Sequence, residues 1–216
     1  MEGFSFQAIG AMLAAVPTPL KTDIHLPSGE SFSVRLGKTE DVSGVTRLIH
    51  AAFSIWKEQG LTLGPMNQTD DETAAHLVSR GYVVEDRKGA LVGTFSLGEG
   101  LVKRTGKTTI RFREDGDSIE CFRIGSNQTI LPSGRLLVFR KAAVALDAAK
   151  SGLGSKLYTL AEGFGRENGY SGMVLQTVKE AGWLYDWYVR LGFKPIGTYR
   201  YPGREVDTIL MIKSFG

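Results

Sequence analysis

The chain has 216 residues, of which 42% are hydrophobic and 23% are charged, and its formal net charge is +3. This length suits one well-buried domain with an extension, and the composition is that of an ordinary soluble globular protein. The positive charge suits an anionic ligand but is too small to predict a nucleic-acid partner, and the single cysteine, Cys121, excludes an internal disulfide, so we expect a reducing, cytoplasmic setting.

Residues 1–30 are expected to form an N-terminal extension, with a short helix followed by a linker that contains Pro17, Pro19 and Pro27. The run AIGAMLAAV is apolar like the core of a signal peptide. However, the segment lacks a basic start and carries Glu2, so we do not interpret it as one. No run predicts a transmembrane span, and we expect no membrane partner.

The next segment, up to residue 98, alternates between strand and helix patterns. SFSVRLG (31–37) predicts a strand, and apolar residues at helical spacing predict a helix over residues 40–60. Thr69 and Glu72 form a capping-box pattern that predicts a second helix ending at Arg80. YVVED, the turn RKG and ALVGTFSLG then predict a β-hairpin.

Residues 99–134 are expected to form a mostly polar insert. It holds two short alternating runs, TIRFR and IECFRI, with EDGDS as a turn between them. Within it, GLVKRTGKT (100–108) resembles a P-loop, but its spacing is one residue too long and a strand pattern follows where a helix is needed. We interpret it as a basic loop, whereas a P-loop would predict ATP binding that depends on Lys107.

The C-terminal part of the sequence again alternates between strands and helices. RLLVFRKAAVAL (135–146) predicts a strand, and a helix that starts near Gly152 ends at the NG of residues 168–169. MVLQTV predicts another strand, WLYDWYVRLG another helix, and FKPIGTYRY and VDTILMIKSF two final strands. This order of elements indicates a mixed α/β or α+β sheet.

The run AAKSGLGSKL (148–157) lies between a predicted strand and a predicted helix. Gly152 and Gly154 lack side chains, the helix start offers orphan N–H groups, and Lys150 and Lys156 add positive charge. Such a run can bind a pyrophosphate, although a plain tight turn has the same pattern. The dinucleotide pattern G-x-G-x-x-G does not fit, because Leu157 stands at its third glycine.

Two runs together resemble the GNAT superfamily of acyl-CoA N-acyltransferases. Ala149-Lys150-Ser151-Gly152-Leu153-Gly154 corresponds to the signature that follows that family's fourth strand, and Tyr188-Val189-Arg190-Leu191-Gly192-Phe193 to a second signature near its C-terminus. The resemblance covers about residues 31–216, with 99–134 as an insert between the family's strands 3 and 4. It implies an α+β fold with a central, mixed, mostly antiparallel twisted sheet, flanked by helices and splayed between the family's strands 4 and 5.

The resemblance implies direct transfer of an acetyl group from acetyl-CoA to a primary amine of a small molecule or peptide, without a metal. Backbone groups of Val144, Ala145 and Leu146 would pair with the pantetheine arm and polarise the thioester. Tyr188 matches the family's general acid, which protonates the departing sulfur. The alternative interpretation of Tyr188 is that it packs in the core as part of an apolar stripe on its helix. The residues that would hold the pyrophosphate are Lys150, Ser151, Gly152, Leu153, Gly154 and Ser155.

The general base is not fixed by the resemblance, because the run 135–146 has no acid where some members carry one. Glu180 is the candidate base, and a solvated surface acid is its alternative. Glu85, Glu205 and Asp207 are further candidates. A water chain could take their place, or the amine could arrive already neutral. Ala149 and Ala181 stand where the family usually has an Arg or Gln and an Asn, which weakens the expected cofactor contacts.

The acceptor is left open. If the insert 99–134 lines the site, its basic residues favour an acceptor with a carboxylate, and its acidic residues favour a polyamine or an aminoglycoside. A non-catalytic acyl-CoA sensor or interaction domain on the same fold is the alternative function. We expect no nucleic-acid partner, a homodimer is left open, and we interpret His25, His50 and His76 as incidental.

Overall fold

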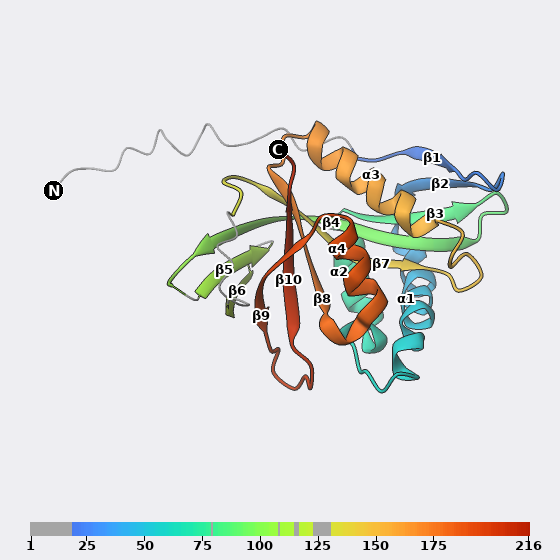
Figure 1. Cartoon of the computed structure of the whole chain (residues 1–216). Coiled ribbons are helices and arrows are strands. Elements are labelled where there is room, and N and C mark those ends of the chain that lie inside the picture. Colours follow the sequence, from blue (N-terminus) through green and yellow to red (C-terminus); the bar gives the residue numbers. More distant parts are fainter. Residues whose placement is uncertain (1–18, 79, 108, 115–116, 123–130) are drawn as a thin grey trace.

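A computed structural model of the chain describes residues 19–78, 80–107, 109–114, 117–122 and 131–216. Within these residues it contains one ten-stranded sheet and four α-helices (Figure 1). The helices are α1 (Val42–Lys57), α2 (Asp70–Val78), α3 (Leu153–Glu167) and α4 (Gly182–Arg190). The strands are β1 (Thr22–His25), β2 (Ser31–Leu36), β3 (Gly81–Asp86), β4 (Leu91–Arg104), β5 (Thr109–Glu114), β6 (Asp117–Phe122), β7 (Leu136–Val144), β8 (Gly172–Val178), β9 (Lys194–Tyr199) and β10 (Thr208–Ser214).

The sheet is mixed and mostly antiparallel, because β7 and β8 run parallel while the other pairings among the described strands are antiparallel. Strand β4 is 14 residues long; it pairs with β3 and β7 and, at its far end, with β5. The β5–β6 hairpin returns to β9 through the pair Phe122–Thr198. The predicted α+β fold with a helix-flanked sheet is confirmed.

Different elements cover the two faces of the sheet. Helices α3 and α4 cover one face, where Leu137 and Met173 of the sheet pack with Leu157 of α3. Helices α1 and α2 cover part of the other face, where Ile49 packs with Val83. The hairpin β5–β6 covers the remaining part of that second face, and its buried apolar residues join a separate cluster with β7, β8 and β10.

Strands β7 and β8 diverge after a short paired stretch. They pair over Leu136–Val138 and Gly172–Val174, and then each continues without pairing to the other. Lys141 on β7 has a φ of 54°, and the register of β7 with β4 shifts there, which marks a β-bulge. The predicted splay in the sheet is therefore confirmed, and it lies on the strand that leads into the glycine-rich run.

Local sequence signals explain several helix boundaries. Thr69 and Glu72 form the predicted capping box: Thr69 Oγ1 accepts from the Glu72 N–H at 3.1 Å, and Glu72 Oε2 accepts from the Thr69 N–H at 2.8 Å. Helix α3 ends at Glu167, directly before the NG pair, as predicted. No helix in the described part of the chain is long and apolar enough to cross a membrane.

The N-terminal segment differs from the sequence-based prediction. Residues 22–25 form β1, which pairs antiparallel with β2, so the predicted linker was wrong for these residues. A strand of four residues between Pro19 and Pro27 is too short to show a period of its own. The short helix predicted further upstream lies outside the described residues, as does part of the EDGDS turn. The boundary at residue 31 and the limits of the insert stay predictions.

Candidate functional site

The glycine-rich run forms a turn between β7 and α3. Lys150 and Gly152 take positive φ angles of 68° and 96°, and Gly152 is the N-cap of α3 without a side-chain cap. A Cβ atom placed on Gly152 would meet nothing within 4 Å, and one on Gly154 would meet only Val144 Cγ2, at 3.9 Å. The protein itself therefore leaves the space in front of both glycines open, and this space adjoins β7.

The start of α3 offers backbone donors to that space. The Leu153 N–H donates to Ser151 Oγ at 3.2 Å, and the Lys156 N–H donates to Gly152 O at 3.1 Å. Among the described residues, the N–H groups of Gly152, Gly154 and Ser155 have no recorded acceptor. Unsatisfied N–H groups at the positive end of a helix dipole favour a phosphate. We refer to residues 150–155 as the cradle.

Helix α3 is held firmly against the sheet behind the cradle. Lys213 of β10 donates to Glu162 Oε2 and to the Tyr158 hydroxyl, both at 2.8 Å. The Tyr158 ring meets Phe139 of β7 and Trp187 of α4, with centroids 6.3 and 6.0 Å apart. These contacts fix α3 relative to both β7 and α4, and hence fix the position of the cradle.

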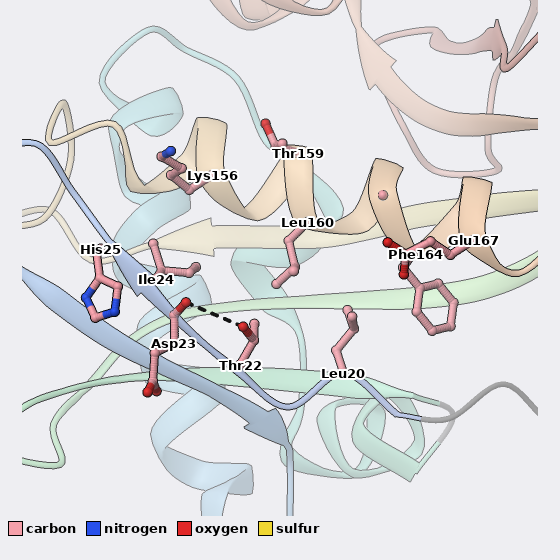
Figure 2. A pocket seen from close by; sticks show the side chains of 11 residues that line it. Leu20, Thr22, Asp23, Ile24, His25, Lys156, Thr159, Leu160, Phe164 and Glu167 are labelled. Carbon is pink, nitrogen blue, oxygen red and sulfur yellow. Dashed lines mark hydrogen bonds between the residues drawn. The ribbon is translucent and has the colours of Figure 1, made fainter.

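A pocket of about 320 Å³ lies on the side of α3 that faces β1. Figure 2 shows that Leu20 and Ile24 from the N-terminal segment face Leu160 and Phe164 of α3 across it, with Lys156 at one end. No residue of β8 or α4 lines this pocket. It therefore adjoins the start of α3 but is separate from the opening between β7 and β8.

The open edge of β7 carries unused backbone groups. The Ala145 N–H donates to Val92 O of β4 at 2.9 Å, so the facing pair Val144–Gly93 is a non-hydrogen-bonded pair of the ladder. The N–H and C=O of Val144 then point away from β4, toward the edge that β8 has left. Of the three residues predicted to contact pantetheine, Val144 has the matching geometry, whereas the Ala145 N–H is already used.

Tyr188 lies on α4 in the same core cluster as Val144 and Ala145. It is 8% exposed, and its ring meets Trp187 and Phe193 with centroids 5.1 and 5.8 Å apart. Burial raises the pKa of its hydroxyl, which stays protonated at neutral pH. No hydrogen bond to this hydroxyl is recorded among the described residues. Its ring packs against its neighbours, as the core-packing interpretation of Tyr188 requires. A buried hydroxyl usually has a hydrogen-bond partner, and a ligand atom would supply one here.

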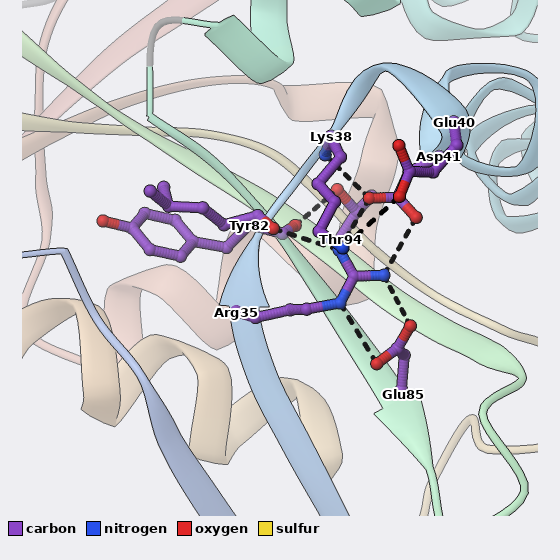
Figure 3. Close-up of polar contacts among 8 residues, drawn as sticks. Arg35, Lys38, Glu40, Asp41, Tyr82, Glu85 and Thr94 are labelled. Carbon is purple, nitrogen blue, oxygen red and sulfur yellow. Dashed lines mark hydrogen bonds and ion pairs between the residues drawn. The ribbon is translucent and has the colours of Figure 1, made fainter.

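The candidate bases have different surroundings. Figure 3 shows Arg35 between Asp41 and Glu85, at 2.7 and 2.5 Å, so Glu85 is held in an ion-pair network that joins β2, β3 and the start of α1. Asp207 pairs with Arg200 at 2.7 Å. Glu180 is exposed on the 3-10 helix η4 (Lys179–Ala181) that follows β8. Glu180 stays a prediction, and in the described part of the chain no hydrogen bond or ion pair joins it to the cradle.

A row of polar residues crosses the sheet face opposite α3, and the sequence did not indicate it. The Arg140 Nε donates to Ser96 Oγ of β4 at 3.2 Å. Gln176 of β8 lies two residues beyond Val174, the last residue that pairs with β7, and is level with Arg140, which lies two residues beyond Val138. The Gln176 side-chain oxygen accepts from the Tyr201 hydroxyl at 2.8 Å. These residues lie far apart in the sequence, on strands that are neighbours in the sheet, so only the strand register brings them together.

His76 belongs to this polar row. Its ring nitrogens lie 3.2 and 3.4 Å from Ser96 Oγ, and the side chain is 7% exposed. Burial lowers the pKa of His76 to about 3, and the charges of Arg140 and Lys141 act in the same direction. The imidazole is therefore neutral at physiological pH. No group of three or more His, Cys, Asp or Glu residues suited to a metal occurs in the described ranges.

Neither a scan against protein-family models nor a search of curated proteins finds a match for this chain. Solved structures do resemble it. A GNAT-family acetyltransferase from Streptococcus agalactiae is 13% identical, with a TM-score of 0.59 over 89% of this chain and 99% of that one. Another from Listeria monocytogenes is 18% identical, with a TM-score of 0.58 over 90% and 100% of the two chains.

A third neighbour carries the cofactor. YncA of Salmonella typhimurium, a putative acetyltransferase solved with acetyl-CoA, is 16% identical, with a TM-score of 0.53 over 86% of this chain and 94% of that one. At these identities the likeness shows the fold. The chain has the GNAT fold, as its two sequence signatures indicate, and its activity has to be argued from its own site.

Proposed function

We propose that the chain is an N-acetyltransferase that transfers an acetyl group from acetyl-CoA directly to a primary amine of a small molecule or peptide. The observation that carries this proposal is the opening between β7 and β8, which leads directly into the cradle. The open backbone edge at Val144 adjoins the cradle at Gly154, because a Cβ atom on Gly154 would lie 3.9 Å from Val144 Cγ2. The acetyl-CoA in YncA, a protein of the same fold, supports the same choice of cofactor.

The cofactor would bind mainly through backbone groups. The cradle N–H groups would hold the pyrophosphate, and Lys150 and Lys156, both exposed, would add charge. Ala149 supplies no bidentate contact. Ala181 is 1% exposed and packs in a cluster with Trp56, so its side chain faces the core and not the opening. We therefore expect weaker cofactor binding than with both side-chain contacts present.

In the proposed reaction, the amine nitrogen attacks the thioester carbonyl carbon, the carbon–sulfur bond breaks, and the departing thiolate takes a proton. A backbone N–H at the open edge of β7 would polarise the carbonyl oxygen. Tyr188 would donate its hydroxyl proton to the sulfur, since its raised pKa keeps that proton in place until the thiolate forms. Water would take the proton from the amine and pass it to the carboxylate of Glu180, the candidate general base.

Calorimetric titration with acetyl-CoA tests the cradle, with ATP and NADH as controls. We expect micromolar binding of acetyl-CoA alone; no binding would contradict the proposal. ATP binding that depends on Lys107 would instead support a P-loop, although Gly106 and Lys107 lie in the β4–β5 turn and no helix follows them.

The variant Tyr188→Phe tests the chemical step. Loss of a general acid lowers turnover by roughly 10²–10⁴-fold, whereas acetyl-CoA affinity should stay unchanged because the ring still packs. The alternative, a non-catalytic acyl-CoA sensor, is favoured by the missing side-chain contact at Ala149 and the exposed position of Glu180. It predicts acetyl-CoA binding without turnover of any amine, both in the wild type and in Tyr188→Phe.

A further inference from the structure

The loop between β9 and β10 contains a preorganised turn, Tyr201-Pro202-Gly203-Arg204. The Arg204 N–H donates to Tyr201 O at 3.0 Å, and Gly203 has a φ of 73°. Proline at the second position and a glycine with positive φ at the third are the features of a type II β-turn. The sequence thus fixes the direction in which the chain presents Arg204.

Tyr201 fastens this turn to the strand that borders the opening. Its hydroxyl donates to Gln176 of β8 at 2.8 Å, and its ring meets Tyr199 edge-on with centroids 4.9 Å apart. Gln176 lies on the part of β8 that has left β7. The turn is therefore held beside the splay, on the sheet face opposite α3.

Arg204 reaches the loop between α1 and α2. A Cβ atom on Gly64 would lie 3.1 Å from Arg204 Nη2, so the missing side chain at Gly64 makes room for the guanidinium. Nearby, Val206 packs in a cluster with Leu63 and Val178. Figure 1 shows both loops at the lower end of the molecule, where β8 also ends. Arg204 thus stands where these two loops meet, next to the end of β8.

The charge of Arg204 has no acidic partner in the described ranges, and the side chain is partly buried. Arg200 on the same loop is different, because it is 60% exposed and pairs with Asp207 at 2.7 Å. A partly desolvated guanidinium favours a carboxylate or a phosphate, whose oxygens match its fork of donors. The turn therefore presents an anion-binding group beside the splay.

We infer that Arg204 binds an anionic group of the acceptor, so that the acceptor is an amine that also carries a carboxylate or a phosphate. This inference rests on the proposed acetyl transfer. The amine would lie at the splay between β7 and β8, next to the thioester. The anion would lie between the β9–β10 loop and the α1–α2 loop. Arg204 then selects the substrate through binding and takes no part in the proton transfers.

The test compares acetyl transfer to matched amines: an amino acid with its amide, and an aminoalkyl phosphate with its amino alcohol. A hydrogen-bonded charge pair predicts that the wild type prefers the anionic member of a pair roughly 10–100-fold in kcat/KM. The pair with the larger preference identifies the anion. Arg204→Gln should abolish this preference by raising KM for the anionic amines, while kcat/KM for the neutral amines stays unchanged. Arg204→Lys should restore part of the preference. Arg200→Gln is the matched control and should behave as the wild type.

Calorimetry with the same compounds, on the protein with and without CoA, separates this inference from the proposed reaction. If acetyl-CoA binds but no amine is acetylated, the proposed acetyl transfer is wrong. The anion site is then still supported if the wild type binds the anionic members more tightly and Arg204→Gln removes this preference. Equal binding of both members by the wild type, or an unchanged preference in Arg204→Gln, would overturn it. Wild-type acetyl-CoA affinity in Arg204→Gln shows that the variant is folded.

Discussion

His76 is a titratable side chain that its surroundings hold neutral. Its environment combines the buried Ser96 hydroxyl with the charges of Arg140 and Lys141. Protonation would place another positive charge in a desolvated site near two others, which explains the lowered pKa. His76 is therefore unsuited to act as a general base near neutral pH, and its titration affects stability instead.

The stability of the protein should depend on His76 between about pH 7 and about pH 5. The pKa of a histidine is 6.5 in an unfolded chain, and that of His76 is about 3 in the folded protein, so the unfolded state binds the proton more readily. The contribution of neutral His76 to the free energy of unfolding is therefore present in full above pH 6.5 and is lost as the pH falls toward about 3. The free energy of unfolding should fall by about 2 kcal/mol at pH ~5.

Urea unfolding of the wild type and of His76→Gln at both pH values measures this effect. The variant cannot titrate, so its free energy of unfolding should change much less between the two conditions. His25→Gln, at an exposed position, is the control and should keep the wild-type dependence. An equally large fall in His76→Gln would assign the pH dependence to other groups.

At the scale of elements, hydrophobic period and capping residues predicted α1, α3, α4 and the β3–β4 hairpin, because these are local signals. The cradle and Tyr188 could be proposed for the same reason, since each lies in one continuous run. The bulge at Lys141 could not, because a lysine with positive φ has no sequence signal. The contact of Arg204 with Gly64 joins two distant loops and depends on the tertiary structure.

Gly152 connects the element scale to cofactor binding. Its φ of 96° is disfavoured for other residues, so Gly152→Ala should destabilise the fold by roughly 1–2 kcal/mol. The added methyl group would also enter the open space in front of the cradle. We therefore expect acetyl-CoA affinity to fall by a larger factor than the loss of folded protein explains, as calorimetry on the folded variant would measure.

Gly163→Ala is the matched control on the same helix. A Cβ atom there would meet nothing within 4 Å, and the position lies inside α3, so the change should stabilise the helix by roughly 0.5–1 kcal/mol. Acetyl-CoA affinity should stay at the wild-type value. Wild-type affinity in Gly152→Ala as well would mean that the phosphate lies elsewhere.

At the scale of the whole molecule, the β5–β6 hairpin makes residues 109–114 and 117–122 part of the sheet. The hairpin joins the end of β4 to β9, and the far face of the sheet is thereby covered over β7, β8 and β10. The same strands carry the α3 core on their other face, since Leu137 and Val138 of β7 belong to different clusters. The two cores therefore share one set of strands, and we expect them to unfold together.

Phe112 tests this coupling. It is 1% exposed and packs with Val138 and Leu210, so Phe112→Ala should lower the free energy of unfolding by roughly 3–5 kcal/mol. Leu101 lies on the adjoining part of β4 and is 38% exposed, so Leu101→Ala should have a much smaller effect. Urea unfolding followed by tryptophan fluorescence and by far-UV circular dichroism should give one coincident transition in both variants. Separate transitions, or a Phe112→Ala variant as stable as Leu101→Ala, would mean that the hairpin does not unfold cooperatively with the rest of the sheet.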